Sequence, residues 1–102
     1  MTAHPRAIFK RAVERGNLVV AEATARELRR LTLEEALGLL FLYAEKEPIK
    51  FERAALRWLG RYVAEGKAIS LLKAQLALSA LAELRAGERE QAAKLLRELV
   101  RP

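Results

Sequence analysis

The feature that most constrains the fold is a series of helix start and stop signals, which divides the chain into six short segments. Pro5 and Pro48 stand where helices can begin, because the first residue of a helix needs no amide proton. Gly16, Gly66 and Gly87 suit helix ends, where glycine accepts the left-handed conformation. Between these signals the apolar residues recur with the helical period, and no run alternates like a strand. The sequence therefore predicts six helices.

We expect these helices over residues 5–15, 18–30, 33–45, 48–65, 69–86 and 88–100. The third has the clearest start, because Thr32 and Glu35 form the sequence pattern of a capping box. Composition agrees, since 19 Ala, 19 Leu, 13 Arg and 13 Glu are all strong helix formers. Connections this short favour antiparallel neighbours. The prediction is an all-α single domain over residues 1–102, either a helical-hairpin bundle or a short right-handed α-α superhelix.

The residues that most catalytic sites need are sparse. The chain has no Cys and no Asp, and its one histidine, His4, precedes the first helix. Ser70 and Lys73 match a Ser-x-x-Lys spacing, but the further motifs of that enzyme class are absent, so we interpret Ser70 as a helix cap. No glycine-rich phosphate loop or Glu-x-x-His pair occurs. We therefore expect no enzyme activity, no cofactor and no metal.

Two predicted helices, 33–45 and 69–86, are apolar most of the way round. Such a helix lies in the centre of a fold or is covered by a partner. One interpretation is a well-filled core with both helices in its middle layer. The other is self-association, as a dimer or with an unknown protein partner, through these residues: Leu39, Leu42, Tyr43, Leu71 and Leu78.

The chain is basic, with a net charge of +6, which makes acidic partners plausible. One basic stripe follows the predicted helix 48–65 and consists of Lys50, Arg53, Arg57 and Arg61. A sequence-tolerant nucleic-acid binder would use such a stripe on phosphates while the neighbouring Trp58 and Tyr62 stack on bases. The alternative is a solvated helix face, with Arg61 paired to Glu65 and arginine stems covering the rings. A second basic group, Arg26, Arg29 and Arg30, is expected in the last turn of the second helix.

The longest uncharged apolar run covers residues 36–44, less than half the length that crosses a bilayer. No secretory signal is evident near the start. Together with the lack of cysteine, which suits a reducing compartment, this predicts a soluble cytoplasmic protein without membrane contact.

Segments 15–22, 32–37 and 54–59 together resemble short helical proteins encoded in high-GC Gram-positive bacteria, a group with no assigned activity. The helix pairs are also similar to tetratricopeptide-like hairpins, and that resemblance implies protein binding on a concave face. The tetratricopeptide signature itself is not met, because Trp58, Gly60 and Tyr62 have a different spacing. Our first hypothesis is a non-catalytic, self-associating interaction module, and the alternative is the nucleic-acid binder.

Overall fold

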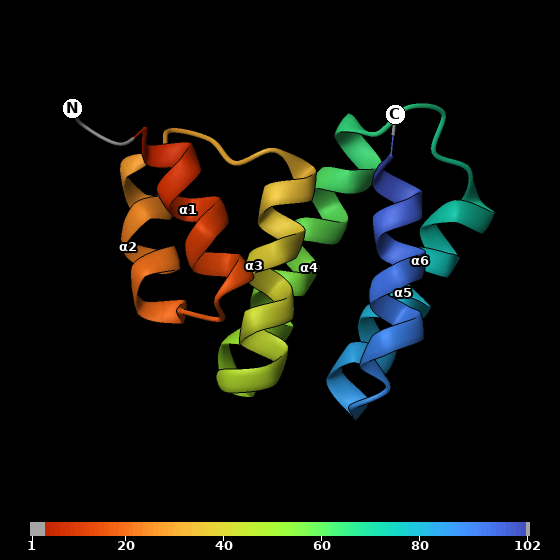
Figure 1. The fold of residues 1–102 in the computed structure, drawn as a ribbon. Coiled ribbons are helices and arrows are strands. Elements are labelled where there is room, and N and C mark those ends of the chain that lie inside the picture. The colour runs from red at the N-terminus through yellow and green to blue at the C-terminus, as the bar shows by residue number, and fades with distance from the viewer. Residues whose placement is uncertain (1–3, 102) are drawn as a thin grey trace.

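The computed structural model describes residues 4–101, which form six α-helices and no strand (Figure 1). Their bounds are α1 Pro5–Glu14, α2 Leu18–Glu27, α3 Leu33–Lys46, α4 Pro48–Glu65, α5 Leu71–Ala86 and α6 Arg89–Val100. Within each of three consecutive pairs the helices pack against each other as antiparallel hairpins. The prediction of an all-α bundle is confirmed.

Local signals set most helix ends. The capping box of α3 is formed, with Glu35 N donating to Thr32 Oγ1 at 3.0 Å and Thr32 N donating to Glu35 Oε1 at 2.8 Å. Ser70 caps α5 by accepting the Lys73 amide at 3.1 Å. Gly87 ends α5 in the left-handed region with φ +99°. These are the ends that the sequence predicts most directly.

Two bounds differ from the sequence-based expectation. Helix α2 ends at Glu27 instead of near Arg30, so Arg26 alone of the second basic group lies in its last turn. The chain is already extended at Leu28, with ψ 130°, and crosses to α3 from there. Two guanidinium groups hold this crossing by donating to the carbonyls of Arg30 and Leu31. Helix α5 begins two residues later than expected, because Ser70 serves as its cap.

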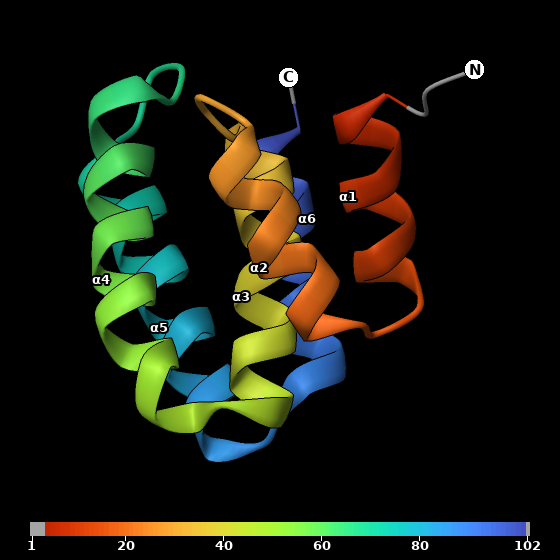
Figure 2. The ribbon, with the colours of Figure 1, turned by 90° about the vertical axis from the view of Figure 1, so that its left-hand side faces the viewer.

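Helix α3 is the centre of the fold, since it contacts all the other helices in the described part of the chain. Two groups of buried side chains meet on it. The smaller group lies between α1, α2 and α3, and the larger between α3, α4, α5 and α6. Figure 2 shows α4 and α5 along one edge of the molecule and α1 along the opposite edge. This leaves α4 and α5 with one side each toward solvent.

The larger core contains an aromatic pair on α4. Trp58 and Tyr62 are stacked with ring centroids 5.3 Å apart, and both are almost fully buried. Trp58 Nε1 donates to the carbonyl of Leu33 at 2.9 Å. The hydroxyl of Tyr62 has no hydrogen-bond partner among residues 4–101. This pair therefore joins α4 to the start of α3 but leaves one buried polar atom unsatisfied.

Candidate interaction surfaces

The apolar surplus of α3 is covered within the chain. Leu42 is 5% exposed, and Leu39 and Tyr43 are partly buried against α1 and α2. The hydroxyl of Tyr43 donates to Glu22 Oε2 at 2.7 Å, which ties α3 to α2. The expectation that Leu39, Leu42 and Tyr43 face a second copy is therefore corrected. The first hairpin already occupies the position that such a copy would need.

The apolar surplus of α5 is not covered. Leu71 is 92% exposed, Leu72 64% and Leu78 50%, whereas the inner side of the helix is fully buried. Residues 74–82 contain no charged side chain, so two and a half turns of this helix lack the usual charged outer face. Leu71 and Leu78, two of the five predicted self-association residues, lie on this uncovered side of α5.

The neighbouring helix α4 extends this surface. Leu56 and Val63 are exposed and lie seven residues apart, on the same side of α4. Leu56 and Leu78 line the same shallow groove between the two helices, which has a volume of about 170 Å³. We call the following exposed set the α4–α5 apolar face: Leu56, Val63, Leu71, Leu72, Leu76 and Leu78. Single exposed leucines are ordinary on proteins, whereas several of them on two adjacent helices indicate a candidate interaction surface.

The basic stripe of α4 is partly used in the fold. Lys50 Nζ pairs with Glu22 Oε2 at 3.2 Å, and Arg61 Nε pairs with Glu65 Oε2 at 2.9 Å. Among residues 4–101, Arg53 and Arg57 have no carboxylate partner. The four predicted residues thus lie along one helix, but two of them are committed to intramolecular pairs.

The aromatic part of the nucleic-acid interpretation is wrong. The rings of Trp58 and Tyr62 point into the core and are buried, so neither presents a flat edge on which a base can stack. What the sequence pattern indicated instead is the core stripe of α4, which also contains Phe51 and Ala55. A helical period alone does not distinguish a stacking platform from a core.

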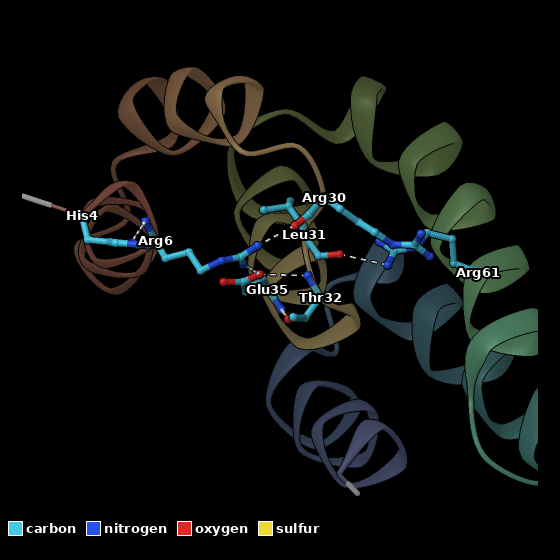
Figure 3. A network of polar contacts seen from close by, with 7 residues as sticks. All are labelled: His4, Arg6, Arg30, Leu31, Thr32, Glu35 and Arg61. Carbon is cyan, nitrogen blue, oxygen red and sulfur yellow. Dashed lines mark hydrogen bonds and ion pairs between the residues drawn. The ribbon is translucent and has the colours of Figure 1, made fainter.

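A network of polar contacts fixes the crossing from α2 to α3 (Figure 3). Arg6 reaches from α1 to pair with Glu35 and donates to the carbonyl of Arg30 at 2.8 Å. From the other side, Arg61 donates to the carbonyl of Leu31 at 2.9 Å. The backbone carbonyls left without helix partners are thereby satisfied. We interpret the network as structural, because its side chains are paired with one another or with backbone carbonyls of the crossing segment.

Several carboxylates are stabilised in their charged form by such contacts. The hydrogen bonds from Arg61 and Arg30 lower the pKa of Glu65 to about 2. The hydrogen bond from Tyr43, aided by Lys50, holds the pKa of Glu22 below its usual range. Burial, together with the charge of Glu22, raises the pKa of Tyr43 to about 12. Each shift favours the form that the group already has at pH 7, which is ionised for the two glutamates and neutral for Tyr43. None of these shifts brings a pKa toward 7, where a group is best suited to proton transfer.

The largest concavity lies between α1, α3 and α6 and has a volume of about 730 Å³. Its floor is apolar and includes Leu37 and Phe41 of α3, while Arg97 of α6 lies over the Phe41 ring at 4.9 Å. The rim mixes acids and bases in these residues: Glu14, Arg15, Glu34, Glu45, Lys46, Arg97 and Arg101. This groove could not be predicted from the sequence, because it depends on the separation of helices far apart along the chain. Its mixed rim favours no single class of ligand.

The two residues considered as catalytic candidates, His4 and Ser70, act as helix caps. His4 Nδ1 accepts the Arg6 amide at 3.2 Å and so caps α1, as Ser70 caps α5. Residues 4–101 contain no group of three His, Cys, Asp or Glu side chains suited to a metal ion. Nor does any helix in this range combine the length and hydropathy needed to cross a bilayer.

Comparisons with known proteins add no relative. No protein-family model matches the chain, and no match is found among curated proteins or among solved structures. The resemblances to short helical proteins of high-GC Gram-positive bacteria and to tetratricopeptide-like hairpins stay predictions.

Proposed function

We propose that this protein is a non-catalytic helical interaction module that self-associates through the α4–α5 apolar face. The observation that carries the proposal is the exposure of Leu71, Leu72 and Leu78 on a helix whose middle turns hold no charge. The excess apolar surface of α3 is covered within the chain by α1 and α2, whereas the outer side of α5 has no such cover. A second copy of this chain would supply the missing cover for α5. The lack of cysteine suits a reducing compartment, so we place this function in the cytoplasm.

The exposed apolar surface is large enough for a reversible dimer. The exposed fractions of the six side chains equal about three and a half whole side chains, each worth about 1.5–3 kcal/mol when fully buried. Two copies would then gain about 10–20 kcal/mol before the cost of association, which is about 4–15 kcal/mol. The surplus is compatible with a dissociation constant near 50 µM, which corresponds to about 6 kcal/mol.

Charge opposes this association, since each chain carries +6. Added salt screens that repulsion, so the dimer should become tighter as ionic strength rises. Binding to nucleic acid has the opposite dependence, because phosphate contacts weaken steeply with salt. The sign of the salt effect therefore separates the proposal from the nucleic-acid alternative, for which Arg53 and Arg57 are the remaining exposed support from the stripe.

The test is light scattering after size-exclusion chromatography over a concentration series of about 5–200 µM, which brackets the expected dissociation constant. We expect the mass to rise from the monomer value of 11.5 kDa toward twice that value. The variant Leu72→Glu/Leu78→Glu should stay monomeric, because it places charges in the centre of the face. Its circular dichroism spectrum should match that of the wild type.

Val19→Glu is the matched control, because Val19 is 78% exposed on α2, which is not part of the face. This variant should associate like the wild type. A wild-type protein that stays monomeric over the whole series would contradict the proposal. Equal association by the Leu72→Glu/Leu78→Glu variant would contradict the assignment to this face.

A further inference from the structure

A shallow groove lies between α2 and α4, over the part of α3 that these two helices leave open. Two adjoining hollows of about 220 Å³ and 490 Å³ form it, and they share Leu31 of the crossing segment (Figure 3). Beside one end, Lys50 of α4 pairs with Glu22 of α2 at 3.2 Å. Toward the other end, Arg30 pairs with Glu65 at 2.7 Å. The two α4 residues of these pairs lie about 22 Å apart along the helix, and we call the space between the pairs the α2–α4 groove.

The floor of the α2–α4 groove is apolar. Ala36, Leu39 and Tyr43 are spaced by three and four residues, so they form one stripe along α3. The first hairpin covers Leu39 and Tyr43 from one side only, and both side chains stay partly exposed. Helix α4 adds Ala54 to the same hollow. An apolar stripe between two walls can accept the apolar side chains of a partner.

The charge around this groove is mainly of one sign. Four arginines line it: Arg29, Arg30, Arg57 and Arg61. Among the lining residues the one carboxylate is Glu65, which is already paired with Arg30 and Arg61. Within residues 4–101, Arg29 and Arg57 have no carboxylate partner. The groove between α1, α3 and α6 differs, because its rim mixes acids and bases.

Positive charge also acts on the floor from both walls. Burial and Glu22 raise the pKa of Tyr43 to about 12, whereas the charges of Arg26 on α2 and Arg57 on α4 act in the opposite direction. Both guanidinium groups are therefore within electrostatic reach of the Tyr43 hydroxyl. A carboxylate held over this part of the groove would be stabilised from α2 and from α4.

We propose that the α2–α4 groove binds an acidic amphipathic helix of a partner protein, with its apolar side chains on the α3 stripe and its carboxylates paired with Arg29 and Arg57. An amphipathic helix that lays its apolar side into a groove is a recurrent mode of recognition. A helix of about four turns matches the 22 Å between the two ion pairs.

Nucleic acid could use the same arginines but would leave the apolar floor without a partner. The rings of Trp58 and Tyr62 are buried, so they offer no stacking surface that would compensate. The groove is also separate from the α4–α5 apolar face. Helix α4 contributes Ala54 and Arg57 to the groove and Leu56 to the hollow that it shares with α5.

The test is fluorescence anisotropy with a labelled synthetic peptide of about fifteen residues. The peptide carries leucines at positions i, i+3, i+4 and i+7 and glutamates on both sides of this stripe. Three further probes serve as controls: a scrambled peptide of the same composition, a peptide with lysine in place of glutamate, and a single-stranded oligonucleotide. We expect the acidic amphipathic peptide to bind with a dissociation constant of about 1–100 µM and each control peptide to bind at least about tenfold more weakly.

The variant Arg29→Glu/Arg57→Glu should weaken binding of the acidic amphipathic peptide by at least about tenfold, because it replaces two pairing partners with like charges. Arg11→Glu/Lys94→Glu is the matched control, since it makes the same change in net charge at exposed positions of α1 and α6. It should change the affinity by less than about threefold, because distant charges are screened. Ala54→Gln keeps every charge but fills part of the groove, so it should also weaken binding. Circular dichroism checks that each variant keeps its fold.

Equal binding of the acidic amphipathic peptide and its scrambled version would overturn the proposal, because it would require surface charge alone. Unchanged affinity in Ala54→Gln would show that the groove is not occupied. No binding of the peptide at about 1 mM protein would contradict the proposal, and oligonucleotide binding that Arg29→Glu/Arg57→Glu abolishes would then assign the groove to nucleic acid. The variant Leu72→Glu/Leu78→Glu should bind the peptide like the wild type, so this proposal and self-association can fail separately.

Discussion

Replacing Tyr62 by phenylalanine removes one oxygen atom from the centre of the larger core. The side chain is 1% exposed, and its hydroxyl has no hydrogen-bond partner among residues 4–101. In the unfolded chain the same hydroxyl is hydrated, so folding strips it of water without replacement. Burial accordingly raises the pKa of Tyr62. The ring and its stacking on Trp58 are kept in the variant.

The expected change is a gain in stability. An unsatisfied buried polar group costs about 1–3 kcal/mol, and the small gap left by the oxygen offsets part of that. We therefore expect Tyr62→Phe to raise the free energy of unfolding by about 1 kcal/mol. For a domain of this size that raises the melting temperature by about 4–8 °C.

Tyr43→Phe is the matched control, because it makes the same chemical change where the hydroxyl is bonded. Tyr43 donates to Glu22 at 2.7 Å, so this variant should lose about 1 kcal/mol. Urea unfolding followed by circular dichroism measures both variants on the same scale. A loss of stability in Tyr62→Phe as large as that in Tyr43→Phe would contradict this prediction, because it would require a hydrogen-bond partner for the Tyr62 hydroxyl.

Three further predictions concern acid, packing and a helix end. The folded-state pKa of Glu65 is about 2 against a usual 4.5, so its contribution to the free energy of unfolding is present above about pH 4.5 and is lost as the pH falls toward 2. Urea unfolding from pH 7 to 3 should show this loss of stability, and Glu65→Gln should make the loss smaller. Leu42→Ala should destabilise the monomer by about 2–5 kcal/mol, whereas Leu71→Ala should change it by less than about 0.5 kcal/mol; equal effects in dilute chemical unfolding would contradict the burial difference. Gly87→Ala should cost about 1–2 kcal/mol in thermal unfolding, because φ is +99° there. No neighbouring atom lies within 4 Å of the added methyl group, so this cost is backbone strain alone, and an unchanged melting temperature would show that the helix end rearranges without strain.

Much of the fold could be predicted because its signals are local. The capping box at Thr32 and the proline at 48 act within one helical turn, and the structure has helices that begin beside both. The end of α2 could not be predicted in this way. Its position depends on Arg6 and Arg61, which reach the crossing segment from other helices. A sequence pattern does not show which side chains of other helices reach this segment.

The candidate surface was predictable only in part for the same reason. Periodicity identified two helices with too much apolar surface but did not show which one the chain covers itself. Leu42 and Leu78 have similar surroundings in sequence, yet one is buried by the first hairpin and the other is half exposed. The difference is tertiary, because α3 contacts all five other helices of the described residues, whereas α5 contacts three of them and buries only its inner stripe.

The most direct test of the central claim is a dilution series of amide correlation spectra by nuclear magnetic resonance, from about 1 mM to about 10 µM, which spans the expected dissociation constant. If the protein associates through the α4–α5 apolar face, the concentration-dependent shifts should cluster at residues 56–63 and 71–86. The signals of α1 and α2 should stay unchanged. Spectra that do not change with concentration, or shifts confined to the groove between α1, α3 and α6, would contradict the account.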